Sequence, residues 1–211
     1  MKRLDFTLNL GKKRLVLPEV GTYKLVFLSL LFVNLTALLV GVLAVSGGAA
    51  TGLTGTLFQE FLQNRMDTTF FNIFSAHIFS SAIIILPLFL LGPSAVGVPF
   101  AYIAVAYKGL GSGVTLGFLY SNFGAQGILF ALSIVIPATF LANVGIVLAA
   151  RETALYSQRV FKMMTSEKEN NNLPHNLAPF CKKYFAILVI MVLAGLLDAG
   201  MSSIFIGLFN F

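Results

Sequence analysis

The chain has 211 residues, of which 57% are hydrophobic and only 10% are charged, and its mean hydropathy is +0.89. A soluble globular protein carries roughly 25% charged residues, so this composition excludes an ordinary cytosolic domain. The single cysteine, Cys181, excludes an intramolecular disulfide, and the sequence has no Cys or His spacing typical of a zinc site.

Charged residues are absent from three long stretches, 25–59, 68–107 and 109–150. Each stretch is longer than the roughly 20 apolar residues that cross a bilayer as a helix. Helices satisfy their own backbone hydrogen bonds in lipid, where water cannot. The sequence therefore predicts an all-α, polytopic integral membrane protein whose first partner is the lipid bilayer.

We expect a bundle of about five transmembrane helices. In chain order the predicted spans are 24–46, 71–91, 95–120, 127–150 and 184–209. The spans form one transmembrane domain, 24–211, which follows a cytoplasmic segment, 1–23. Residues 121–126 connect the third span to the fourth, and Lys108 lies in the middle of the third, which leaves open whether that span is divided into two half-helices.

The net charge of +6 would suit nucleic acid or another anionic surface if it were spread over a soluble face. Most basic residues instead fall into two clusters, a bias typical of short cytoplasmic segments. Four spans lie between the clusters, so both can be cytoplasmic, with the N-terminus inside and the C-terminus outside. We expect no nucleic-acid binding. The clusters are Lys2, Arg3, Lys12, Lys13, Arg14 and Lys24, and then Arg151, Arg159, Lys162, Lys168, Lys182 and Lys183.

Between the first two spans, an apolar helical face is predicted with polar residues on the other sides. This pattern fits a short helix on the outer membrane surface or a docking face for a partner, and it also fits a helix that merely caps the bundle. The candidate partner face consists of Leu57, Phe58, Phe61 and Leu62.

Lys108 and Asp198 are the two charged residues predicted to lie within the membrane. A charge at the centre of a membrane helix costs about 2.5–3.5 kcal/mol on insertion scales, so such residues are functional candidates. They are predicted to pair across the third and fifth spans, although both could also reach toward an interface.

Gly109, Gly113 and Gly117 recur every four residues and so line one helix face. In lipid this pattern lets two helix backbones approach closely, either within one chain or between two chains. The spans are also interrupted by prolines that remove backbone donors and are interpreted as packing kinks. These prolines are Pro87, Pro99 and Pro137.

For catalysis the sequence offers little. His77 lies in a span without a carboxylate or cysteine at helical spacing, and His175 lies in a polar loop. No metalloprotease, phosphate-binding or hydrolase motif occurs. We therefore expect no catalytic residues, no metal and no cofactor, and a protein that is not an enzyme.

The segment from Lys108 to Leu119, which reads KGLGSGVTLGFL, is followed by Gly124, Gly127 and Pro137 and by small residues up to Arg151. The last span adds AGLLDA at 194–199. Together these features resemble the stage II sporulation protein M family, over roughly residue 70 to the C-terminus. This chain has Ala138, Thr139 and Ala142 where many members carry polar or acidic groups.

The resemblance implies a multi-spanning membrane anchor without enzymatic activity. Members in spore-forming bacteria act in engulfment of the forespore, where they recruit two peptidoglycan-degrading partners, stage II sporulation proteins D and P. For this chain the resemblance implies a scaffold in the bacterial cell membrane that localises cell-wall hydrolases. In a sporulating cell that membrane would be the septal or engulfing one. The competing class is a transporter or a permease accessory subunit, indicated by the prolines, the glycines and the Lys108 and Asp198 charges. The oligomeric state is left open.

Overall fold

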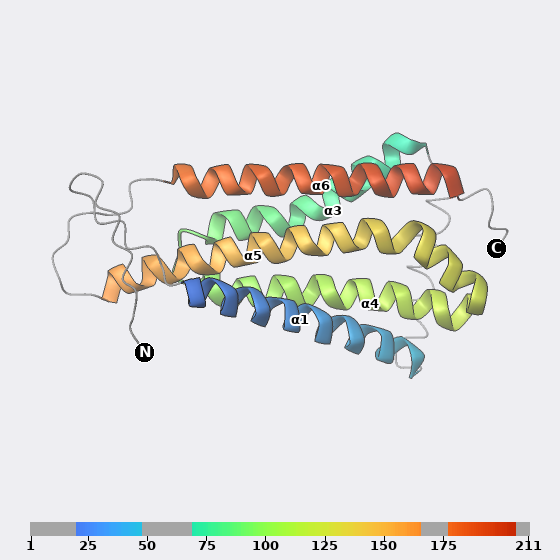
Figure 1. Cartoon of the computed structure of the whole chain (residues 1–211), viewed down its shortest axis with the longest axis horizontal. Helices are drawn as coiled ribbons and strands as arrows, with labels where there is room; N and C mark the ends of the chain where they lie inside the picture. The colour runs from blue at the N-terminus through green and yellow to red at the C-terminus, as the bar shows by residue number, and fades with distance from the viewer. Residues whose placement is uncertain (1–19, 48–68, 166–176, 206–211) are drawn as a thin grey trace.

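The computed structural model describes residues 20–47, 69–165 and 177–205 of the chain. Every element in these ranges is helical, and Figure 1 shows the long helices side by side in one elongated bundle. The predicted all-α fold is therefore confirmed for the described residues. The elements are α1 (Val20–Ser46), α3 (Phe70–Leu91), α4 (Gly97–Phe130), a short π-helix η1 (Ala131–Val135), α5 (Ile136–Thr165) and α6 (Ala178–Phe205).

Four helical stretches in the described residues are long and apolar enough to cross a membrane. Their outward faces are also apolar: Leu25, Phe32 and Leu43 of α1 are each more than two thirds exposed. Large apolar side chains on the outside of a helical bundle are stable when lipid, and not water, surrounds them. The chain therefore has the build of a multi-pass membrane protein. The stretches are Tyr23–Ser46, Phe70–Leu91, Gly97–Lys162 and Ala178–Phe205.

The third stretch, 66 residues long, doubles back on itself. Gly124 breaks the helix with φ 52° and ψ −126°, a conformation that a side chain would strain. A Cβ on Gly127 would lie 2.1 Å from the carbonyl oxygen of Leu119. In a straight helix these two residues, eight positions apart, would be separated by about 12 Å, so the chain folds back between them. As a result α5 runs back beside α4, as Figure 1 shows, and the reversal falls within the predicted connection at 121–126.

Two of the predicted proline kinks have local explanations. Pro137 follows η1, in which the backbone N–H of Ile136 reaches back to the carbonyl of Ala131. This widened turn accommodates Pro137, which has no backbone N–H to donate and whose ring would otherwise clash with the preceding helical turn. Pro99 lies in the first turn of α4, where its missing N–H would have no helical partner in any case.

The charges end the apolar zone but do not end the helices. The predicted fourth span stops at Ala150, whereas α5 continues to Thr165 through Arg151 and Lys162. Similarly, α6 begins at Ala178, before the predicted start at 184. Lys and Arg are good helix formers, so charge marks where the membrane zone stops while the helix continues.

The core is shared by all the long helices. One fully or almost fully buried side chain per helix illustrates this: Leu30, Leu88, Val105, Ile146 and Met191.

The glycine face of α4 lies directly against α1. A Cβ on Gly113 would lie 2.0 Å from the carbonyl oxygen of Leu38, and one on Gly109 would lie 2.6 Å from that of Asn34. Gly117 meets Val42 in the same way, and on the α1 side Gly41 meets the carbonyl of Leu110. The close approach predicted from the spacing therefore joins two helices of the same chain, backbone to backbone.

Replacing Gly113 with Ala should push α1 away from α4. We expect the free energy of unfolding in detergent to fall by about 1–3 kcal/mol, because the new methyl group meets backbone that cannot move aside. Gly111→Ala is the matched control, since nothing lies within 4 Å of its added Cβ. Equal stability of the two variants in a denaturant titration would contradict the contact.

Candidate functional site

Three regions of the described structure carry functional side chains: one charged end of the bundle, a shallow hollow beside it, and a polar cluster buried between the helices. The charged end, called here the basic end, contains the start of α1, the second half of α5 and the start of α6. Its basic residues in the described ranges are Lys24, Arg151, Arg159, Lys162, Lys182 and Lys183.

Glu152 holds the basic end together. Its carboxylate, in a residue only 7% exposed, accepts hydrogen bonds from Arg151 Nη2 at 2.7 Å and Lys183 Nζ at 2.6 Å. Because Glu152 lies on α5 and Lys183 on α6, the pair ties these helices to each other. A buried carboxylate needs such partners, since desolvation of an unpaired charge is costly.

The first helix joins the same end through Tyr23. The Arg151 guanidinium lies over the Tyr23 ring, 5.9 Å from its centroid, and Arg159 donates a hydrogen bond to the Tyr23 hydroxyl. The Ser157 hydroxyl donates to the carbonyl of Ser94, between α3 and α4, at 2.6 Å. The two basic clusters of the sequence, separated by more than 100 residues, therefore meet at one end of the bundle where both have described residues.

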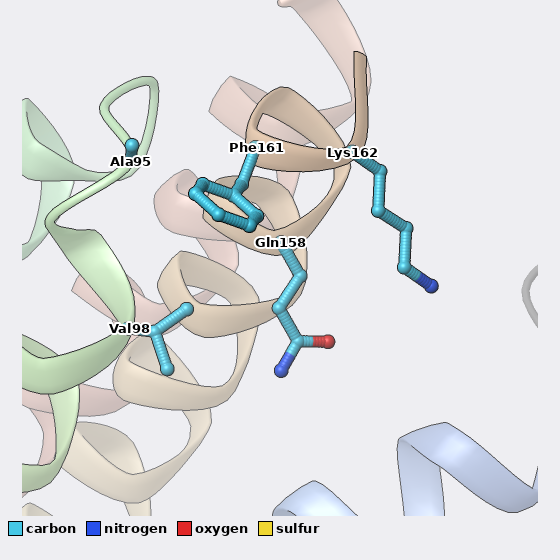
Figure 2. Close-up of a pocket in the computed structure, with 5 residues that line it drawn as sticks. All are labelled: Ala95, Val98, Gln158, Phe161 and Lys162. Carbon is cyan, nitrogen blue, oxygen red and sulfur yellow. The ribbon is translucent and has the colours of Figure 1, made fainter. Parts of the chain in front are cut away.

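The shallow hollow lies between the start of α4 and the end of α5. Figure 2 shows the Phe161 ring directed toward Ala95 and Val98, whereas the Lys162 side chain points away from them. The hollow has a volume of about 260 Å³, and Gln158 contributes an amide to its lining. Phe161 is 54% exposed, an apolar ring on the surface at the basic end.

The polar cluster, defined as His77, Lys108, Asn143 and Asp198, is contributed by four helices. His77 Nδ1 of α3 lies 3.1 Å from Asp198 Oδ2 of α6, and the two side chains are 11% and 8% exposed. The helices approach closely here, because Gly195, one turn before Asp198, leaves room for the Phe74 ring of α3, and the His77 ring lies next to it. This pair is the best-buried acid–base contact in the described structure.

Lys108 interacts with the same carboxylate: Asp198 acts electrostatically on the Lys108 ammonium. The direct contact of His77 with Asp198 is one that the sequence analysis did not predict. On the other side, the Ser112 hydroxyl donates to the Lys108 carbonyl at 2.9 Å and accepts from Asn143 Nδ2 at 3.3 Å.

Sequence reasoning did not select His77 because it sought a partner on the same helix. The partner is on α6, and no spacing within α3 could reveal it. A usable signal was present: His77 and Asp198 are both rare polar residues in apolar spans, and such groups pair with one another in lipid.

Some predicted residues have no described geometry. The candidate partner face at Leu57, Phe58, Phe61 and Leu62 lies outside the described residues, as do the basic residues before the first span. Its two flanking helix ends are described: Ser46 ends α1 and Phe70 begins α3, both at the end of the bundle away from the basic end in Figure 1.

The comparisons with known proteins add no relative. No protein-family model, curated protein or solved structure matches this chain.

Replacing Glu152 with Gln should loosen the basic end. We expect the free energy of unfolding in detergent to fall by about 1.5–3 kcal/mol, the usual contribution of hydrogen bonds to a charged group. Lys182→Gln serves as the control, because Lys182 is exposed and next to Lys183 in sequence. If both variants unfold at the same denaturant concentration, Glu152 does not join α5 to α6 as described.

Proposed function

We propose that this protein is a non-enzymatic membrane anchor that recruits and localises peptidoglycan-remodelling proteins, as the resemblance to stage II sporulation protein M implies. In this proposal the chain crosses the bacterial cell membrane five times, once for each of α1, α3, α4, α5 and α6, because Gly97–Lys162 is long enough for two crossings. In a sporulating cell the membrane would be the septal or engulfing one.

One observation carries the proposal: α1 ends and α3 begins at the end of the bundle opposite the basic residues, and the segment with the candidate partner face connects these two helices in the sequence. Its flanking ends, Ser46 and Phe70, lie at that end, whereas Tyr23 and Arg159 meet at the other. Basic segments stay in the cytoplasm, so the segment 48–68 would emerge on the outer side. Peptidoglycan lies on that side, and so would the proteins that remodel it.

The build of the bundle supports a holding role. The glycine contacts join α1 to α4, and the Glu152 network joins α5 to α6. Both helices that flank segment 48–68 are therefore fixed in one body: α1 through α4, and α3 through its contact with α6 at Gly195. A binding segment presented by rigid supports loses less conformational entropy when a partner binds.

The proposal is tested by changing the candidate partner face in the full-length protein. The double variant Phe58→Ser, Phe61→Ser should copurify at least about tenfold less peptidoglycan-hydrolysing activity from crosslinked membranes, the change expected from a loss of about 1.4 kcal/mol of binding. The apolar rings are expected to supply most of the contact area.

Gln59→Ser, Gln63→Ser is the matched control, because these residues lie on the polar side of the same predicted helix. All variants must retain the unfolding profile of the original protein in detergent. Hydrolase recovery that is unchanged by the double Phe variant would remove the proposed docking face.

A second candidate function, a transporter or permease accessory subunit, is favoured by the buried pair of His77 and Asp198. Titratable residues inside a membrane bundle occur on proton and substrate pathways. In reconstituted vesicles this function would appear as proton-dependent solute flux. Asp198→Asn should abolish the flux, whereas Glu152→Gln, at the basic end, should leave it unchanged. Absence of flux in the original protein would exclude this candidate for the solutes tested.

A further inference from the structure

The hydrogen bond between His77 and Asp198 determines which ring nitrogen of His77 stays basic. A carboxylate oxygen accepts, so His77 Nδ1, at 3.1 Å from Asp198 Oδ2, carries the proton of this contact. In a neutral imidazole the other nitrogen then keeps its lone pair. Nε2 is that nitrogen, and it is buried without a hydrogen-bond partner among the described atoms.

A second unpartnered group lies on the same face of α3. Ser81 follows His77 by four residues, which places both side chains on one side of the helix. Ser81 is 2% exposed, and its hydroxyl is also buried without a described partner. Buried polar groups are rarely left unpaired, so a basic nitrogen and a hydroxyl on one face of the same apolar helix, both without a described partner, mark a place where a further hydrogen bond can form.

The surrounding charges restrict what can bind there. The Asp198 carboxylate of α6 contacts the ring, and the Lys108 ammonium of α4 interacts electrostatically with that carboxylate, so the two opposite charges offset each other. Asn143 of α5 is polar but does not titrate. No group of three His, Cys, Asp or Glu residues able to hold a metal ion occurs in the described part of the chain. A base with one hydroxyl beside it suits a proton instead.

We propose that His77 is an intramembrane proton-binding site. A hydronium ion transfers a proton to the Nε2 lone pair, so that its O–H bond breaks as the N–H bond forms and a water molecule leaves; the Ser81 hydroxyl accepts the resulting hydrogen bond, and Asp198 remains a carboxylate that orients the ring. His77 and Asp198 lie about two helical turns, on the order of 10 Å, from the ends of α3 and α6 opposite the basic end.

This site is independent of the proposed anchor function, and it can be observed directly. The chain has two histidines, so His175→Gln leaves His77 as the only imidazole. The full-length variant is labelled with ¹⁵N-histidine and reconstituted in lipid nanodiscs, and the ring nitrogens are followed by NMR during acidification. We expect the Nδ1–H tautomer at neutral pH, and then reversible convergence of the two nitrogen signals as Nε2 gains its proton.

Two further variants separate the site from a merely structural pair. With Asp198→Asn, the Nε2–H tautomer should become the major neutral form, because the amide no longer fixes the proton on Nδ1. Ser81→Ala should shift the Nε2 signal, whereas Ser80→Ala, at the exposed neighbouring position, should not. Ring-nitrogen signals that never converge on acidification, or an Nε2–H tautomer in the His175→Gln protein, would overturn the proposal.

Discussion

The contact between α1 and α4 depends on backbone meeting backbone, and much of the bundle follows from it. Lipid is as apolar as leucine, so burying apolar side chains between helices gains little in a membrane, and close packing must supply the attraction. Gly109, Gly113 and Gly117 allow that packing because any side chain there would meet the α1 backbone. With α1 fixed in this way, Tyr23 reaches Arg151 and Arg159 at the basic end.

The two ends of the bundle have different chemistry, and this asymmetry gives the protein a direction. At the basic end, Glu152 is surrounded by cations and the helices continue past the apolar zone. At the other end, Gly124 turns the chain within a largely apolar helical hairpin that packs against Phe205 of α6. The proposed anchor function would use such a direction, because its partners would all be held on one side of the membrane.

The polar cluster shows how an apolar protein keeps titratable groups inside. Asp198 is in hydrogen-bond contact with His77 and interacts electrostatically with Lys108, so its charge is not isolated.

Sequence alone determined the class of the molecule, the helical positions and the close-packing face, because hydropathy, charge clusters and a four-residue glycine period act along the chain. It also located the reversal near Gly124. Only the tertiary structure decided the partners: that Gly113 faces α1, that Glu152 reaches Lys183, and that Asp198 contacts His77. The physical reason is that these contacts depend on which helices are neighbours and how each is rotated, and residue spacing within one helix specifies neither.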